Sequence, residues 1–214
     1  MNKLESELKV KIKRSFLDNY HRPLHLHPEF IQFDDKDLTN NGFTTFKSSE
    51  IKDFRCGVNW FHYYFVFGRE YEFHIRNFND QVLKIKFNSY FGIKKREHHK
   101  LYTSIIDSLW NLYFNNQVND FLREFENGES FYIGDVVVNP EGIIIKVSKL
   151  TKLEKVQISW EDLRFRLYRT YFSVYSKSNP IEINRGYSYK EDWNTFVLYN
   201  VIKIILSNKK IDND

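Results

Sequence analysis

The stretch "ISWEDLRFRLYRTYFSVYS", Ile158–Ser176, alternates large apolar side chains with basic ones. A looser version, "SEIKDFRCGVNWFHYYFVF", occupies Ser49–Phe67, about one hundred residues earlier in the chain. Alternation of this kind is typical of strands that bury one face and expose the other. Two such passages in one chain indicate that a β-rich unit was duplicated.

The sequence around the two passages also repeats in the same order. A hairpin is predicted before each passage, with Gly42 and Gly142 at equivalent turns. An amphipathic helix is predicted after each passage, because the apolar spacing fits one helix face. Its apolar positions are Leu101, Ile105, Leu109, Leu112 and Tyr113 in the first half and Trp193, Val197, Val201, Ile204 and Ile205 in the second.

We therefore expect an α+β protein made of two strongly bent antiparallel sheets or barrels, each closed by its own C-terminal amphipathic helix. Residues 1–27 are predicted to form an N-terminal arm or short helix, although Leu8, Val10 and Ile12 also alternate as in a strand. Residues 28–127 form the first domain, with its closing helix and a linker helix. Residues 128–214 form the second domain.

Composition supports a sheet-rich fold. Aromatic residues make up 18% of the 214 residues and the chain contains no alanine. Aromatic side chains suit pleated, half-buried surfaces, whereas alanine is the best helix former; an AT-rich genome would produce the same bias. We expect Trp160 and Trp193 to lie at the centre of the second core, where their large side chains would be buried.

The order of hairpin, W-x-D-L motif, aromatic strand and closing helix resembles the bacterial pleckstrin-homology-like domains, including the GRAM-like group. The residues that carry the resemblance are Gly142, Ile143, Trp160, Asp162, Leu163, Phe172, Trp193 and Val197, with Gly42, Phe43, Ile51, Asp53, Phe54 and Leu101 as weaker counterparts in the first half. The resemblance implies two such domains in tandem. It also implies an option of binding phosphoinositides through basic residues.

Several classes of protein are disfavoured by the sequence. The single cysteine, Cys56, excludes an intramolecular disulfide and indicates a reducing compartment. The charged N-terminus does not have the pattern of a signal peptide, and no apolar run is long enough to span a membrane. A net charge of +4 is too small to indicate nucleic acid as a partner. We expect a cytoplasmic protein that is not transmembrane.

Residues suited to catalysis or to metal binding do not form a recognisable pattern. His25 and His27 point the same way in an extended segment, but no third ligand lies at a telling spacing. Cys56 lies in a predicted strand with no sign of an activating environment. No phosphate-binding loop, H-E-x-x-H or G-x-S-x-G motif occurs. We therefore predict no catalytic residues, no metal site and no cofactor.

Binding is the remaining function, and a non-catalytic module that binds another protein is the first expectation. Inhibitor or immunity-type proteins that cap a toxin are one such class. The alternative is peripheral binding of anionic lipid or another polyanion by a basic rim on the second domain. The ligand-binding residues predicted for that rim are Lys146, Lys149, Lys152, Arg164 and Arg166. The basic run from 94 to 100 would add to a polyanion-binding patch.

Overall fold

The computed structural model describes residues 7–15, 18–35, 42–148 and 152–212. The chain divides into two compact units, Met1–Asn116 and Gln117–Asp214, which are treated separately below. Within the described residues, no helix is both long enough and apolar enough to cross a membrane.

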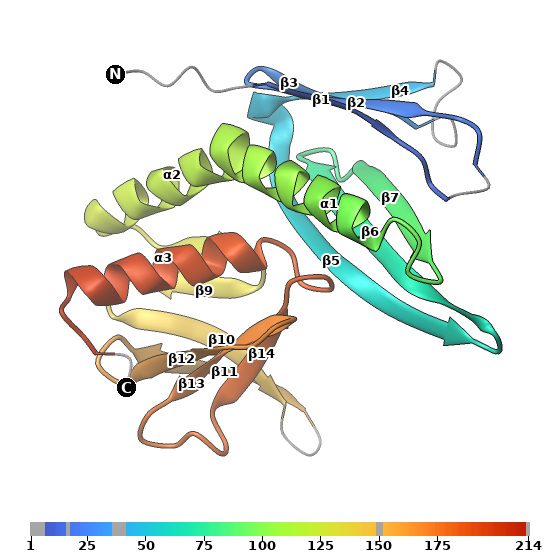
Figure 1. Ribbon diagram of the computed structural model, residues 1–214. Helices are drawn as coiled ribbons and strands as arrows, with labels where there is room; N and C mark the ends of the chain where they lie inside the picture. Colours follow the sequence, from blue (N-terminus) through green and yellow to red (C-terminus); the bar gives the residue numbers. More distant parts are fainter. Residues whose placement is uncertain (1–6, 16–17, 36–41, 149–151, 213–214) are drawn as a thin grey trace. The chain divides into compact units, whose positions relative to one another are not determined.

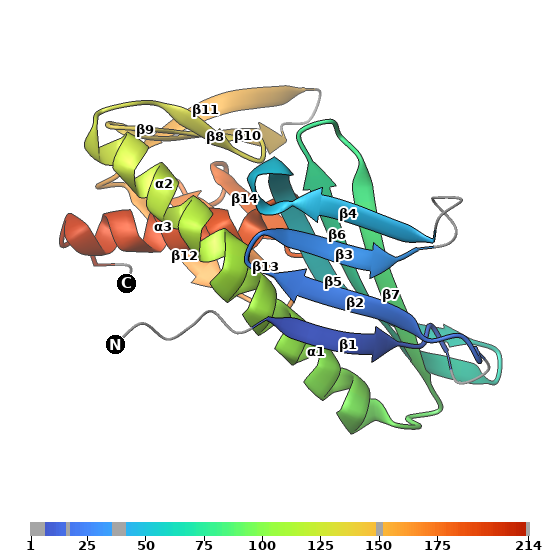
Figure 2. The same cartoon turned by 90° about the horizontal axis from the view of Figure 1, so that it is seen from above.

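The first unit begins with a four-stranded antiparallel sheet in which each strand pairs with the next (Figure 2). Its strands are β1 (Leu8–Ile12), β2 (Arg22–His27), β3 (Phe30–Asp34) and β4 (Phe43–Lys47). Alternate residues are buried: on β2, Leu24 and Leu26 are buried, whereas His25 and His27 keep contact with solvent. This period of two is why these short segments form strands that cover one core.

A 3₁₀ helix, Ser48–Glu50, leads into a second, three-stranded sheet. Its strands are β5 (Ile51–Tyr63), β6 (Val66–Asn77) and β7 (Val82–Tyr90). Helix α1 (Lys95–Leu109) follows and packs on this sheet (Figure 1). The Tyr102 ring lies 4.9 Å from that of Phe73. The helix continues through a π-helical segment, Trp110–Phe114, and then into α2 (Asn115–Glu126).

The second unit repeats this order. A four-stranded sheet comprises β8 (Phe131–Ile133), β9 (Val136–Asn139), β10 (Gly142–Ser148) and β11 (Leu153–Ser159). A three-stranded sheet comprises β12 (Leu163–Leu167), β13 (Tyr171–Ser176) and β14 (Asn184–Ser188). Helix α3 (Thr195–Asn208) packs on this sheet through Tyr199, whose ring lies 5.5 Å from that of Phe165.

The predicted fold class, two pleckstrin-homology-like bent sheets or barrels, is wrong. The described strands form four separate open sheets and no closed barrel, although the broader α+β class is compatible with the structure. The physical reason lies at two junctions. In the first unit, the 3₁₀ helix before β5 separates the four-stranded sheet from the three-stranded one. In the second unit, the turn at 160–162 before β12 does the same. The strands on either side of each junction therefore do not pair.

Other details of the structure also differ from the predictions. The segment expected to be an arm or short helix, 1–27, contains the paired strands β1 and β2. The boundary between the units follows Asn116, within α2, rather than residue 127. Trp160 is 1% exposed, as expected for a core residue, but Trp193 is only half-buried and precedes α3.

Candidate binding surface on the first unit

The longest hairpin of the described chain is formed by β5 and β6 in the first unit. The two strands stay paired from Ile51 opposite Asn77 to Tyr63 opposite Val66. Their inner halves are buried and contribute Phe54, Cys56 and Phe73 to the core. From Trp60 to Phe67 every residue except Phe61 is exposed, so the end of the hairpin extends beyond the part of the sheet that the core supports.

The outer end of this hairpin is unusually apolar. We call Trp60–Phe67 the hairpin tip. Its exposed large apolar members are Trp60 (63%), Tyr63 (72%), Tyr64 (77%), Phe65 (92%), Val66 (39%) and Phe67 (47%), and His62 is exposed among them. Single exposed apolar residues are common on proteins, but a contiguous exposed group usually marks an interaction site.

Aromatic contacts give the hairpin tip a defined shape. The Arg69 guanidinium lies 3.6 Å from the centre of the Trp60 ring, a cation–π geometry that holds the two side chains together. The Phe67 ring meets Phe91 edge-on at 5.4 Å. Gly68 leaves room for the backbone of β7 and for the Phe61 ring, because a Cβ at that position would lie 2.3 Å from the Ser89 carbonyl oxygen and 2.5 Å from the Phe61 ring.

A cavity of about 510 Å³ lies at the base of the hairpin tip. Its lining includes Trp60, Phe67 and Arg69 from the hairpin, Lys95 at the start of α1, and Gly92 from the segment between β7 and α1. That segment adds two exposed apolar side chains, Phe91 and Ile93. The tip and the start of α1 therefore form one continuous surface, which we call the hairpin surface.

Basic residues border the hairpin surface. Lys94, Lys95 and Arg96 are exposed at the start of α1, and Lys94 forms an ion pair with Glu97 at 3.6 Å. A second cavity of about 400 Å³ lies beside them and is lined mainly by basic and polar groups. Its lining residues are Lys11, Lys13, Ser15, His21, Asn88, Tyr90, Ile93, Lys94, Glu97, His98 and Leu101.

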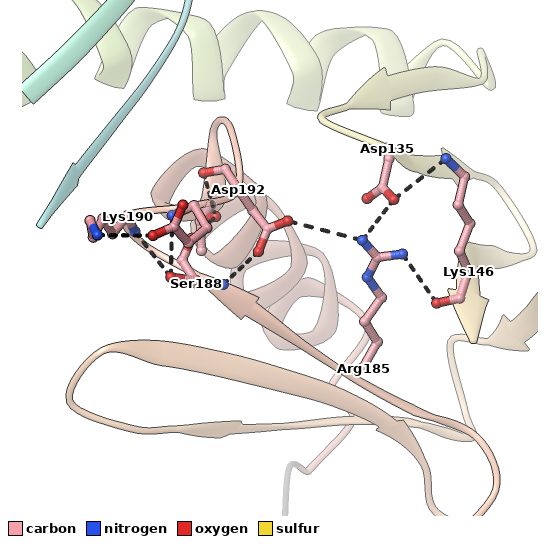
Figure 3. Close-up of polar contacts among 8 residues, drawn as sticks. Asp135, Lys146, Arg185, Ser188, Lys190 and Asp192 are labelled. Carbon is pink, nitrogen blue, oxygen red and sulfur yellow. Dashed lines mark hydrogen bonds and ion pairs between the residues drawn. The ribbon is translucent and has the colours of Figure 1, made fainter. Parts of the chain in front are cut away.

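The binding residues predicted from the sequence do not form one patch. Lys146 on β10 belongs to a polar network in the second unit (Figure 3). Its ammonium lies 3.6 Å from Asp135, and its carbonyl oxygen accepts a hydrogen bond from Arg185 at 3.1 Å. Arg185 also pairs with Asp135 at 2.8 Å. This network joins β10 to β14, so Lys146 has an evident structural role.

The other predicted residues lie in different surroundings. Arg164 is 7% exposed and donates hydrogen bonds to the carbonyl oxygens of Glu161 and Leu163. Arg166 is exposed on the same strand, beside a depression of about 530 Å³ whose lining includes Tyr168, Tyr171 and Tyr175. Lys152 pairs with Glu154 at 2.7 Å, and Lys149 lies outside the described residues.

Neither His25 and His27 nor Cys56 acquires a chemical role from the structure. The His25 Nε2 lies 2.8 Å from Glu7, and its ring contacts those of His27 and Phe30 edge-on. The described residues contain no group of three metal-binding side chains. Burial raises the pKa of the Cys56 thiol to about 12, so the nucleophilic thiolate is not populated at neutral pH.

Comparisons with protein families, with curated proteins and with solved structures found no match to this chain. The resemblance to pleckstrin-homology-like domains therefore rests on the sequence pattern alone. Sequence reasoning missed the hairpin surface because "YYFV", Tyr63–Val66, was assigned to a strand interior, whereas the structure places a two-residue turn at Tyr64 and Phe65. The run of uncharged aromatic residues was the available signal.

Proposed function

We propose that this protein is a non-catalytic binding module that engages its partner through the hairpin surface of the first unit. The observation that carries the proposal is the exposure of contiguous aromatic side chains at the hairpin tip, with Phe65 92% exposed. Apolar area left in water costs free energy, about 25 cal/mol per Å², which docking recovers. The raised pKa of the only cysteine supports a role without thiol chemistry.

A photo-crosslinking amino acid placed at position 65 of the full chain tests this proposal in cells. We expect defined adducts from position 65 and few from position 132, because Tyr132 is an exposed aromatic residue of the second unit outside the hairpin surface. Mass spectrometry identifies the class of the adducts. Equal, unselective labelling from both positions would overturn the proposal. A cytoplasmic location, expected from the sequence, stays a prediction.

A further inference from the structure

We propose that the partner of the hairpin surface is an anionic lipid membrane, with the hairpin tip inserted at the interface and the neighbouring basic residues against lipid phosphates. This inference rests on the proposed function and names the partner. A protein partner is the first expectation from the sequence, but the chemistry of the hairpin surface favours the lipid alternative, at residues of the first unit rather than the second.

The turn itself gives the first reason. Two-residue hairpin turns favour Asn-Gly or Asp-Gly, because the turn requires positive φ angles. Here Tyr64 occupies a turn position with φ +51°. A bulky L-residue in this conformation costs roughly 1 kcal/mol relative to glycine. Folding alone therefore disfavours tyrosine at this position, and its presence indicates that an exposed aromatic side chain is useful there.

The second reason is the kind of side chains that the tip exposes. Tryptophan and tyrosine concentrate at membrane interfaces, since the ring is apolar and the N–H or O–H group stays near the headgroups. Tyr63 precedes the turn and Tyr64 lies within it, with their rings edge-on at 4.7 Å, and Phe65 is the most exposed large apolar residue described. Trp60 lies further from the turn on β5.

The dimensions of the tip also suit shallow insertion. A strand rises about 3.4 Å per residue. Phe65, two residues beyond Phe67, therefore lies roughly 7 Å further out along the hairpin. Side chains that bind at a membrane interface penetrate about 5–10 Å. Together, Tyr63 and Phe65 supply the apolar groups for that depth.

The charge around the tip gives the third reason. No aspartate or glutamate occurs from 54 to 69, whereas Arg69, Lys95 and Arg96 lie on or beside the hairpin surface. Lys95 and Arg96 make no ion pair with the described residues. Lys11 and Lys13 extend this positive border into the adjacent cavity, where Glu97 is the only acidic lining residue. An anionic leaflet attracts such a border, and salt weakens that attraction.

Vesicle sedimentation with the full chain tests the inference. The probes are phosphatidylcholine vesicles with and without about 30 mole per cent phosphatidylserine, a fraction that gives a strongly negative surface. We expect binding only to the anionic vesicles, with loss of binding on raising the salt concentration. Brominated acyl chains should quench the fluorescence of the tryptophan introduced by Phe65→Trp on binding, whereas Tyr132→Trp should add no quenching.

Matched variants separate the two parts of the surface. Phe65→Ser should weaken vesicle binding about tenfold, because one apolar side chain no longer inserts. Lys95→Gln with Arg96→Gln should weaken it about thirtyfold, since each cation near an anionic surface contributes a factor of roughly five. Tyr132→Ser, in the second unit, should bind as the wild type does. All substituted side chains are exposed, so circular dichroism should report unchanged folding.

The outcomes distinguish the inference from the proposed function. Absence of binding to anionic vesicles at low salt, or equal binding by Phe65→Ser and the wild type, would overturn the lipid inference. If a defined protein adduct still forms from position 65 in cells, the proposed function stands and its partner is a protein. If neither vesicles nor crosslinking detects the hairpin surface, both are wrong.

Discussion

Replacing Trp160 tests the core of the second unit most directly. The indole is 1% exposed, and its Nε1 donates a hydrogen bond to the Asn139 carbonyl oxygen at 3.1 Å. The Phe125 ring meets it edge-on at 5.4 Å. One side chain therefore joins the end of β9, the turn before β12 and helix α2, so its loss removes burial, a hydrogen bond and an aromatic contact together.

Two substitutions divide this contribution. Trp160→Ala should lower the free energy of unfolding of the second unit by about 3–5 kcal/mol, the usual range for removing a large core aromatic. Trp160→Phe keeps most of the apolar volume but leaves the buried Asn139 oxygen unpaired, which costs about 1–3 kcal/mol. Tyr132→Ala removes an exposed aromatic from the same unit and should change stability by less than about 0.5 kcal/mol.

Hydrogen exchange measured by mass spectrometry is the suitable assay, because a protein of two units need not unfold in one step. Peptides from α3 should exchange faster in Trp160→Ala, whereas peptides from α1 should keep their wild-type rates if the units unfold independently. Urea denaturation gives the size of the change. A loss below about 1 kcal/mol in Trp160→Ala, or one equal to that of Tyr132→Ala, would refute the assigned core.

Three further predictions concern stability. Burial, together with Arg55, Lys84 and Lys86, lowers the pKa of His74 from 6.5 to about 4, despite the opposing effect of Glu72. The unfolded chain then binds the proton more readily than the folded one, so the free energy of unfolding is highest above pH 6.5. It should fall by about 1–2 kcal/mol as the pH drops towards 4, a range that already allows for partial solvent screening. Urea midpoints measured across this pH range should show the fall, and His74→Gln should remove it. Gly142→Ala should destabilise the second unit by more than about 2 kcal/mol, because the added Cβ would lie 2.0 Å from the Ile158 carbonyl oxygen. An unchanged midpoint in thermal or urea unfolding would contradict this close contact. In a double-mutant cycle, Arg185→Met and Asp135→Asn should show a coupling of about 0.5–1.5 kcal/mol, and additive effects would mean that the pair in Figure 3 contributes nothing.

The sequence pattern predicts burial better than it predicts strand pairing. In "VLKIKF", 82–87, the apolar residues Leu83, Ile85 and Phe87 alternate with lysine, and all three are buried on β7. The same alternation does not show where one sheet ends, because pairing depends on contacts between strands distant in sequence. The breaks before β5 and β12 therefore appeared only in the structure, and the predicted barrel was wrong.

The candidate site was hard to predict for local reasons. Arg164 and Arg166 have the spacing of one strand face, yet Arg164 is buried because the carbonyl oxygens of Glu161 and Leu163 accept its hydrogen bonds. Such backbone acceptors carry no sequence signal. At the hairpin tip, Tyr64 replaces the residues that usually mark a turn, so the turn was read as a strand.

The two three-stranded sheets suggest where a binding surface arose in a repeated architecture. In the second unit, β12 and β13 span Leu163–Leu167 and Tyr171–Ser176, and Phe165 and Phe172 contact α3. In the first unit the corresponding hairpin is far longer, and its added length carries exposed rather than buried apolar side chains. Lengthening a hairpin beyond its core costs conformational entropy, and side chains that stay exposed offset little of it. Under the proposed function, burial against a partner supplies that compensation and accounts for an extension whose end is aromatic instead of polar.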